Sequence, residues 1–566
     1  MTPTSHLPVK PQKIRELFPD AIISKIFPAP EDPRFNYDGF KPGRRVLEAG
    51  HVRYPGRRPF GVRTIYERDH AIAVRDGAHL YADILRPESS DTQPVPCILP
   101  WSPYGKTGTG PQDYDFMAPY RAGIALDRTS GYEKFETPDP AEWAERGYAV
   151  LNIDARCAGR SAGVIARWGI QEAEDVYDVI DWLSIQPWCN GSVVMAGNSW
   201  LAISQINFAS RMHHPALKAI APWEGYTDLY RHFVARGGRP HIPGFHRIIY
   251  NGLAGREGVE NVVAMLEKRP LYDDYSEAKR IPVENSENIP MHVVASYSSM
   301  LHTYGLFQTF SKPRQKRSGS VSIRIKSLNI ANLLTDKDTN WELSTPRVRL
   351  SLLGFESDGS SATTVIERSE EGYPLARQRL RTLYLDGTTG KLMDSKTDQE
   401  NIKSYEGWSL DDGLTFTTTF DVTTELAGYP KTVLHISCAD HDDFDIVVQI
   451  RKIDTNGHQL SHLNYPCPVP IDEVPDVNTA KTLGPQGFLG ASHSVSLNRD
   501  GGPVAFEDLS RETDVLHSHR VRHSISPGTI VRLEIPIWPI GMVFAAGEGI
   551  ALNVSGHDMC LSNRTG

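Results

Sequence analysis

A serine at position 199 stands between an apolar run and a helix-like run, where its hydroxyl could act as a nucleophile. Residues 192–204 read SVVMAGNSWLAIS. The apolar residues 193–195 predict a buried strand, and the residues after Trp200 predict a helix. A strand that turns sharply through Gly-x-Ser into a helix exposes the hydroxyl and points the first helical N–H groups at a developing oxyanion. Ser199 is therefore a candidate nucleophile for attack on an acyl carbonyl.

The Gly-x-Ser triplet is weak evidence without its surroundings. The same triplet occurs at 159–161, 359–361 and 490–492, and none of these matches lies between an apolar strand and a helix. Position 201 is leucine, so the strict Gly-x-Ser-x-Gly form is absent. A serine that merely caps the N-terminus of a helix is the alternative to a nucleophile.

The elements around Ser199 predict an α/β fold. Short apolar runs at 95–100, 148–153, 217–221 and 290–296 read as buried strands, and residues 172–183 carry a helical apolar face. Alternating residues on either side of Asp76-Gly77 predict a hairpin before them. Strands that alternate with helices indicate a mostly parallel sheet. Tyr104 follows the strand at 95–100, at the sheet edge where ligands bind.

The rest of the chain divides into segments that differ in composition and hydrophobic pattern. Residues 1–60 are rich in Pro, Lys and Arg and read as an arm on the body of an α/β domain at 61–345. Residues 226–285 interrupt the strands with helical stretches, as a cap over a pocket would. From 346 to 566, short alternating strands with frequent turn residues predict a β-sandwich or jelly roll.

The composition of the chain limits the classes of partner that it can bind. The chain has 566 residues and a net charge of −9, which argues against nucleic acid or an anionic membrane as the main partner. No apolar run approaches the roughly 20 residues that cross a bilayer, and the N-terminus has no secretory hydrophobic core. Six scattered cysteines without C-x-x-C spacing indicate reduced thiols, so we expect a cytoplasmic protein. A homodimer is compatible with this sequence.

No cofactor motif is visible in the sequence. It has no Gly-rich phosphate loop, no dinucleotide fingerprint and no spaced metal-ligand cluster, so we expect no cofactor and no metal. The run around Asp440 and His441 could be read as a metal site, but carboxylates at a strand entry are more often solvated.

Further stretches accompany the nucleophile motif. They are 74–80 (VRDGAHL), 101–106 (WSPYGK), 154–161 (DARCAGRS), 172–200, and in the second half 440–444 (DHDDF), Arg520 and 533–539. Together they resemble the cocaine esterase and X-Pro dipeptidyl-peptidase group of α/β-hydrolases over residues 62–300 and 346–558. The resemblance implies an α/β-hydrolase domain with a helical cap, followed by a jelly-roll domain that helps to wall the pocket.

The resemblance also implies roles for individual residues. Ser199 would be the nucleophile, and the Tyr104 hydroxyl and the Trp200 backbone N–H would stabilise the oxyanion. The family's catalytic aspartate would fall at Ser298, so a serine occupies the acid position. Between Ser299 and Pro346 the only histidine in the sequence is His302, which could act as the base if the loop after Ser298 folds back.

The segment that should carry the family's histidine is unusual. Residues 311–340 are basic and Ser-rich without a helical period, and the chain stops before the last strand of such a jelly roll. One interpretation is a faulty gene model; the other is a catalytically impaired member that acts by binding. The main hypothesis is a serine hydrolase that cleaves a small-molecule ester or amide through an acyl-enzyme on Ser199. The alternative is acyl transfer, in which an alcohol or amine other than water accepts the acyl group from the same serine.

Overall fold

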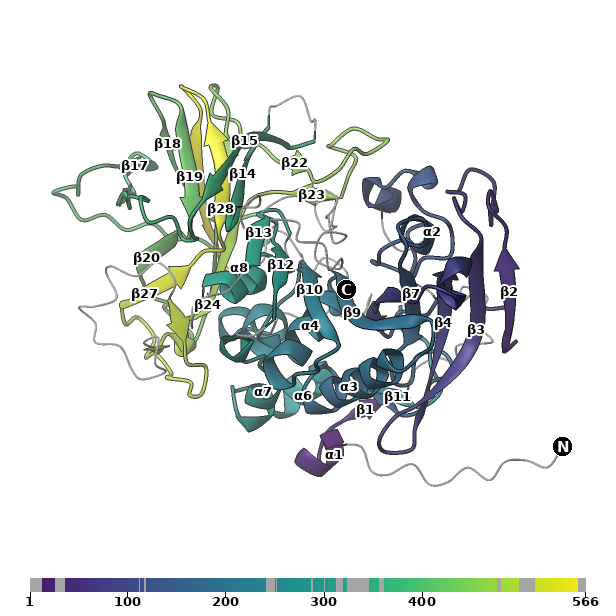
Figure 1. Ribbon diagram of the computed structural model, residues 1–566. Helices are drawn as coiled ribbons and strands as arrows, with labels where there is room; N and C mark the ends of the chain where they lie inside the picture. The colour runs from purple at the N-terminus through teal and green to yellow at the C-terminus, as the bar shows by residue number, and fades with distance from the viewer. Residues whose placement is uncertain are drawn as a thin grey trace.

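A computed structural model gives the architecture of the chain. It describes residues 13–25, 36–110, 112–116, 119–240, 250, 252–286, 289–299, 301–311, 319–322, 346–355, 361–475, 480–497 and 515–557. A mixed β-sheet flanked by helices fills one half of the molecule, and an all-β region fills the other (Figure 1). Most of the atypical segment 311–340, including 323–340, and the last residues 558–566 lie outside the described part.

Parallel strands form the centre of the large sheet, as the sequence predicts. Neighbouring strands in this part run in the order β7 (Ala149–Asp154), β5 (Val95–Ile98), β9 (Cys189–Asn198), β10 (Leu217–Trp223), β12 (Met291–Val294) and β13 (Gly319–Ser322). Each pairs in parallel with the next. The carboxyl ends of these strands therefore meet at one edge, the edge that binds ligands in open α/β sheets.

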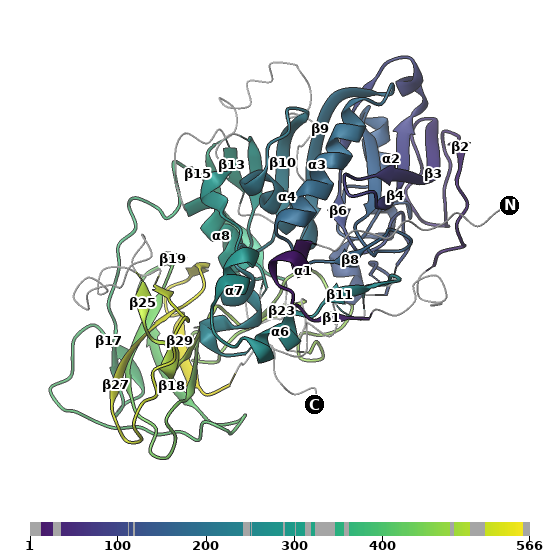
Figure 2. The ribbon, with the colours of Figure 1, turned by 90° about the horizontal axis from the view of Figure 1, so that it is seen from below.

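Helices cover the central strands because both faces of these strands are apolar. β7 is buried along its whole length. Helix α3 (Ile170–Ser184) buries Val176, Val179, Ile180 and Leu183, and α4 (Trp200–Arg211) is buried for most of its length. Buried apolar faces of this kind are the usual pattern for a parallel sheet covered by helices. Both helices lie together beside the sheet in the two ribbon views (Figures 1 and 2).

The predicted hairpin forms the start of the sheet. β3 (Thr64–Ala73) and β4 (His79–Pro87) pair antiparallel, and the chain turns at Gly77, whose φ is 87°. A positive φ is the conformation that the Asp-Gly sequence favours. The N-terminal residues add to this body: β2 (Gly43–Leu47) pairs with β3, β1 (Ile23–Ser24) pairs with a strand of the insertion, and α1 spans Lys13–Leu17.

The described residues of the insertion at 226–285 form short elements. They are the helical turns η5 (Tyr230–Val234), η6 (Arg236–Gly238) and η7 (Val283–Asn285), strand β11 (Gly258–Glu260), and the helices α6 (Val262–Lys268) and α7 (Asp274–Lys279). β11 pairs with β1 and with β8 (Val164–Ile165), so a small second sheet ties this insertion to the body.

The C-terminal half is all-β, as predicted. One sheet contains β16 (Tyr384–Asp386), β17 (Lys391–Met393), β18 (Leu414–Thr419), β29 (Gly549–Ser555), β21 (Asp445–Ile453) and β24 (Gln486–Gly490). β20 (Lys431–Ile436) pairs with β27 (Val531–Pro536). Residues such as Phe416, Ile446, Leu533 and Met542 form a separate apolar core for this half.

One strand connects the two halves. β14 (Val348–Gly354) pairs with β15 (Thr363–Glu370) along one edge. Along the other edge it meets β13 at Val348 and β28 (Ile540–Phe544) at Leu353. β19 (Thr424–Gly428) then pairs with β28. The expected boundary near residue 345 stays a prediction, because the sheet itself continues across this point of the chain.

Candidate active site

Ser199 sits at the sharp turn between β9 and α4. Its φ of 56° and ψ of −117° are a conformation that residues other than glycine rarely adopt. The Ser199 backbone N–H donates to the carbonyls of Trp223 (3.0 Å) and Glu224 (2.8 Å), which fixes the turn against the end of β10. Strain held in place by such contacts is common where a side chain must be aimed for chemistry. The alternative of a plain N-cap loses its support, because the Ser199 side chain caps no helical N–H.

His302 lies beside the Ser199 hydroxyl. The distance from Ser199 Oγ to His302 Nε2 is 3.3 Å, and both side chains are buried. The chain after Ser298 folds back, because the Thr303 hydroxyl donates to the Ser296 carbonyl (2.7 Å) before helix α8 (Thr303–Ser311) begins. The condition under which the sequence allowed His302 as a base is therefore met in the structure.

Glu224 approaches the other nitrogen of the same imidazole. It follows β10 directly, and its Oε2 lies 3.6 Å from His302 Nδ1. Ser298, at the acid position that the family resemblance indicates, instead shares a hydrogen bond of 3.0 Å with Ser296 Oγ. Sequence reasoning did not single out Glu224 for this position. The signal that could have found this role is its place at the carboxyl end of the strand next to β9.

Tyr104 and Trp200 lie next to the nucleophile. Tyr104 follows β6 (Trp101–Ser102); its buried side chain hydrogen-bonds Ser199, and its ring meets the Trp200 ring edge-on at 6.1 Å. Burial raises the pKa of Tyr104 well above its usual value, and the nearby Glu136 raises it further. The phenol therefore keeps its proton and can donate it to an oxyanion. The Trp200 backbone N–H stands at the start of α4, where N–H groups lack helical partners.

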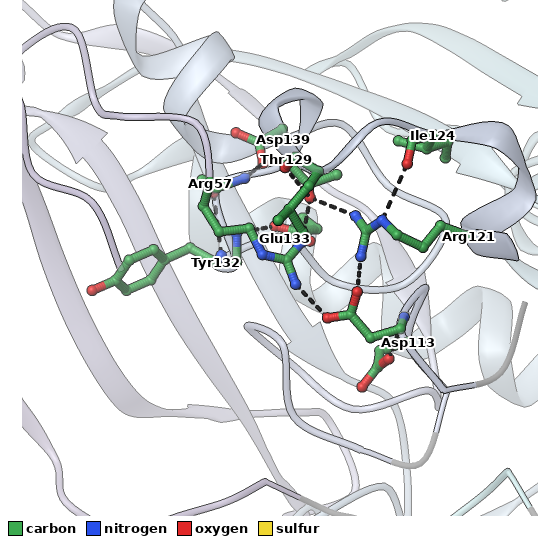
Figure 3. A network of polar contacts seen from close by, with 12 residues as sticks. Arg57, Asp113, Arg121, Ile124, Thr129, Tyr132, Glu133 and Asp139 are labelled. Carbon is green, nitrogen blue, oxygen red and sulfur yellow. Dashed lines mark hydrogen bonds and ion pairs between the residues drawn. The ribbon is translucent and has the colours of Figure 1, made fainter. Parts of the chain in front are cut away.

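A polar network fixes the loop that packs on Tyr104 (Figure 3). The guanidinium groups of Arg57 and Arg121 both donate to Thr129 Oγ1, at 2.5 and 2.9 Å, and both pair with Asp115. This loop ends at Phe135, whose ring lies 5.7 Å from the Tyr104 ring. The network therefore fixes the loop whose Phe135 ring packs on the Tyr104 ring.

A second carboxyl group, Glu136, lies near the nucleophile but bonds elsewhere. Glu136 Oε1 accepts from Asn198 Nδ2 at 2.8 Å, and the Glu136 carbonyl accepts from the Asn198 N–H at 3.1 Å. Burial raises the pKa of Glu136 to about 7, and the charge of Glu224 adds to this rise. Glu136 therefore joins the loop to the strand that carries Ser199.

Glu172 accepts a hydrogen bond from the Trp200 side chain. Its Oε1 accepts from the indole N–H groups of Trp101 and Trp200, each at 3.2 Å. Burial raises the pKa of Glu172 to about 7, although the hydrogen bond from Trp200 opposes the rise. A carboxyl that binds its proton more tightly when folded stabilises the fold at low pH and loses this contribution as the pH rises.

This shift predicts a pH-dependent stability. The unfolded carboxyl titrates near 4.5 and the folded one near 7. The contribution of Glu172 is complete below pH 4.5 and falls by up to about 3 kcal/mol as the pH rises through 7. In Glu172→Gln we expect this fall to disappear, so that urea unfolding at pH 5 and pH 8 differs less than in the wild type. The control is Glu174→Gln. Glu174 lies on the same helix as Glu172 and forms an ion pair with Lys13 of α1. Equal pH dependence in wild type and Glu172→Gln would contradict the assignment.

One group of potential metal ligands occurs among the described residues. Cys438, Asp440 and His441 bring one ligand atom each within 4.8 Å of one another, on a largely exposed turn between β20 and β21. Asp440 already accepts from His441 Nδ1 at 2.9 Å. The turn therefore satisfies its polar groups internally, and the expectation of no metal stays a prediction.

Comparisons with known proteins bear on the family of the chain. The family model for X-Pro dipeptidyl-peptidase (S15 family) matches residues 76–311, and that for the X-Pro dipeptidyl-peptidase C-terminal non-catalytic domain matches residues 339–566. Cocaine esterase from Rhodococcus is 32% identical over 160 residues, which is 28% of this chain and 24% of the relative. A Mycobacterium bovis protein named as a candidate serine esterase is 34% identical over 128 residues, 22% of this chain and 20% of the relative. The chain thus matches a fifth to a quarter of these relatives' lengths.

Solved structures resemble nearly the whole chain. A CocE/NonD family hydrolase from Staphylococcus aureus is 25% identical with a TM-score of 0.78, covering 95% of this chain and 92% of that one. An α-amino acid ester hydrolase, 14% identical with a TM-score of 0.58 over 88% of this chain and 90% of that one, shares the fold. None of the helices that the structure describes is long and apolar enough to cross a membrane.

Proposed function

The chain belongs to the cocaine esterase and X-Pro dipeptidyl-peptidase family of α/β-hydrolases, and from this membership we propose that it is a serine hydrolase of small-molecule esters or amides. The observation that carries the proposal is the line of three side chains: the Ser199 hydroxyl, the His302 imidazole 3.3 Å away, and the Glu224 carboxylate 3.6 Å from the second imidazole nitrogen. A nucleophile, a base and a group that orients the base are the parts that acyl transfer requires.

The geometry suggests a mechanism in which each residue has one task. Ser199 Oγ attacks the acyl carbonyl while His302 Nε2 takes the hydroxyl proton. The Glu224 carboxylate, 3.6 Å from His302 Nδ1, stabilises the imidazolium that forms. The Tyr104 hydroxyl and the Trp200 N–H donate to the oxyanion of the tetrahedral intermediate. His302 then protonates the leaving group, and water releases the acyl group from Ser199 by the reverse proton transfers.

An ester is the substrate that we favour over a peptide. The curated relatives carry esterase names. In addition, a peptidase of this kind needs a carboxylate to bind the substrate's amino terminus, and Glu224 lies 3.6 Å from His302 instead. Peptide hydrolysis, the other activity in the family's name, is the alternative, since the same residues could perform it.

A fluorophosphonate probe tests the proposal directly. We expect a covalent adduct on Ser199, mapped by peptide mass spectrometry, because such probes react with serines that a base has activated. The adduct should be absent in Ser199→Ala. It should persist in Ser161→Ala, which removes a serine of another Gly-x-Ser triplet whose hydroxyl donates to the Asp154 carbonyl at 2.8 Å. Folded wild-type protein without an adduct on Ser199 would overturn the proposal.

A further inference from the structure

A buried arginine near Ser199 has no carboxylate partner among the described residues; its neighbours are the Tyr226 and Tyr250 side chains and the Trp200 ring. Arg167 is fully buried, at 0% exposure. None of its Nε, Nη1 and Nη2 atoms makes a hydrogen bond with the residues that the structure describes. Removing a guanidinium from water without a counterion or acceptors is costly, so buried arginines are almost always paired. An unpaired one indicates that a partner is missing.

The neighbouring residue presents a further unused donor. The indole N–H of Trp168 is also buried and lacks a partner among the described residues. Trp168 is held at a φ of 56°, which is unfavourable for a residue with a Cβ. Arg167 and Trp168 thus offer hydrogen-bond donors and no side-chain acceptor. A group that satisfies them must be an acceptor, and a negative charge would also satisfy the guanidinium.

The nearby carboxylate is already occupied. Glu260 Oε2 accepts from the Arg167 backbone N–H at 2.8 Å and from Lys279 Nζ at 2.6 Å. Glu260 Oε1 accepts from the Tyr275 hydroxyl at 2.7 Å. No carboxylate of the described residues lies within ion-pair distance of the Arg167 guanidinium, since no such contact occurs among their salt bridges.

These unused donors lie one side chain away from the reacting atoms. Arg167 Cζ is 5.1 Å from the centroid of the Trp200 ring, and Trp200 is bonded to Ser199. The Trp168 ring packs on Trp200 at 4.7 Å and on Tyr226 at 5.1 Å, and the Tyr226 ring stacks on His302 at 6.3 Å. The aromatic rings around His302 therefore continue directly to the guanidinium.

We propose that Arg167 and the Trp168 N–H bind a carboxylate carried by the substrate, so that the substrates of this site are anionic esters or amides. The inference rests on the proposed hydrolase function and names its substrate class. The planar guanidinium matches the two oxygens of a carboxylate, and the aromatic surroundings exclude water, which strengthens the pair. Because the overall charge of the chain is −9, only such a local cation gives an anion a favourable place.

Matched esters test the substrate class. 4-Nitrophenyl butyrate is neutral, mono-4-nitrophenyl glutarate carries a carboxylate on its acyl part, and 3-butyryloxy-4-nitrobenzoic acid carries one on its leaving group. We expect at least one anionic ester to have a kcat/KM about tenfold or more above the neutral ester. In Arg167→Gln this preference should disappear, with kcat/KM for the anionic ester falling about tenfold or more, as expected for the loss of a charged hydrogen-bonded partner. Arg167→Lys should restore it in part.

The control removes another buried, aromatic-stacked arginine. Arg231 lies 3.7 Å over the Tyr272 ring but is paired with Asp228 at 2.7 Å, so Arg231→Gln should leave the ratio of anionic to neutral turnover unchanged. Turnover of the neutral ester by Arg167→Gln is the baseline against which the loss for the two anionic esters is measured. Equal loss for all three esters in Arg167→Gln, or no preference for an anionic ester in the wild type, would overturn the proposal.

A binding measurement separates this inference from the hydrolase proposal. Isothermal titration calorimetry of glutarate against the wild type should give binding that Arg167→Gln weakens at least tenfold, whether or not Ser199 turns over any ester. Binding of glutarate without a fluorophosphonate adduct would overturn the hydrolase proposal and leave the anion site. An adduct on Ser199 without glutarate binding or anionic preference would overturn the anion site and leave the hydrolase proposal.

Discussion

Replacing His302 by alanine is expected to lower kcat for 4-nitrophenyl butyrate by about four to six orders of magnitude, with KM changed little. A serine hydroxyl is a weak nucleophile until a base takes its proton, and His302 Nε2 lies 3.3 Å from Ser199 Oγ. The loss concerns the transition state, so it should appear in kcat. Steady-state kinetics measures the loss of ester turnover. The rate of fluorophosphonate labelling measures the loss of Ser199 reactivity.

A second buried histidine provides the control for this experiment. His214 Nδ1 accepts from the Ala216 N–H at 3.1 Å, away from Ser199. His214→Gln should keep kcat within a few fold of the wild type, while its melting temperature reports any structural cost. A decrease of less than about tenfold in His302→Ala, with the protein folded, would mean that another group serves as the base.

Glu224→Gln is expected to lower kcat by about two to four orders of magnitude. The amide keeps the shape of the side chain but loses the charge that stabilises the imidazolium, and it can hold the wrong tautomer of His302. We place the effect below that of a fully buried acid, because the Glu224 side chain is 23% exposed and its Oε2 lies 3.6 Å from Nδ1. The pH dependence of kcat should change with it, since the base would lose its partner.

Glu136→Gln separates this role from a general effect of negative charge. Glu136 is the other carboxyl group near the nucleophile, but it bonds Asn198 rather than His302. We expect a loss of less than about tenfold in kcat for this variant. If Glu136→Gln proved as damaging as Glu224→Gln, the carboxylates would act through the local field and not through the orientation of the imidazole.

The fold and the turn at Ser199 could be predicted because both depend on short stretches of sequence. Apolar runs of strand length, the Asp76-Gly77 turn and the helical face at 172–183 each carry a local pattern, and the structure confirms them as β5, β7, β9, β10, β12, the β3–β4 hairpin and α3. Ser199 was predicted for the same reason: its turn lies between a recognisable strand and a recognisable helix.

The partners of Ser199 could not be assigned with the same means, because they depend on contacts between distant residues. Glu224 and His302 come from different strand ends, and only the parallel order of β9, β10 and β12 brings them together. His302 faces Ser199 because Thr303 folds the chain back onto Ser296, a turn without a clear sequence signature. The resemblance to a family also directed attention to Ser298, which pattern alone would not have singled out.

The connecting role of β14 bears on how this protein is made. The last residues of β14 on its second edge pair with β28, which is formed by Ile540–Phe544 near the end of the chain. A growing chain on the ribosome must therefore carry this strand edge unpaired through most of the synthesis of the second half. Unpaired edges attract other strands, so nascent chains are most exposed to aggregation during this interval. The large sheet gains the β28 and β19 strands only after residues 540–544 have been made.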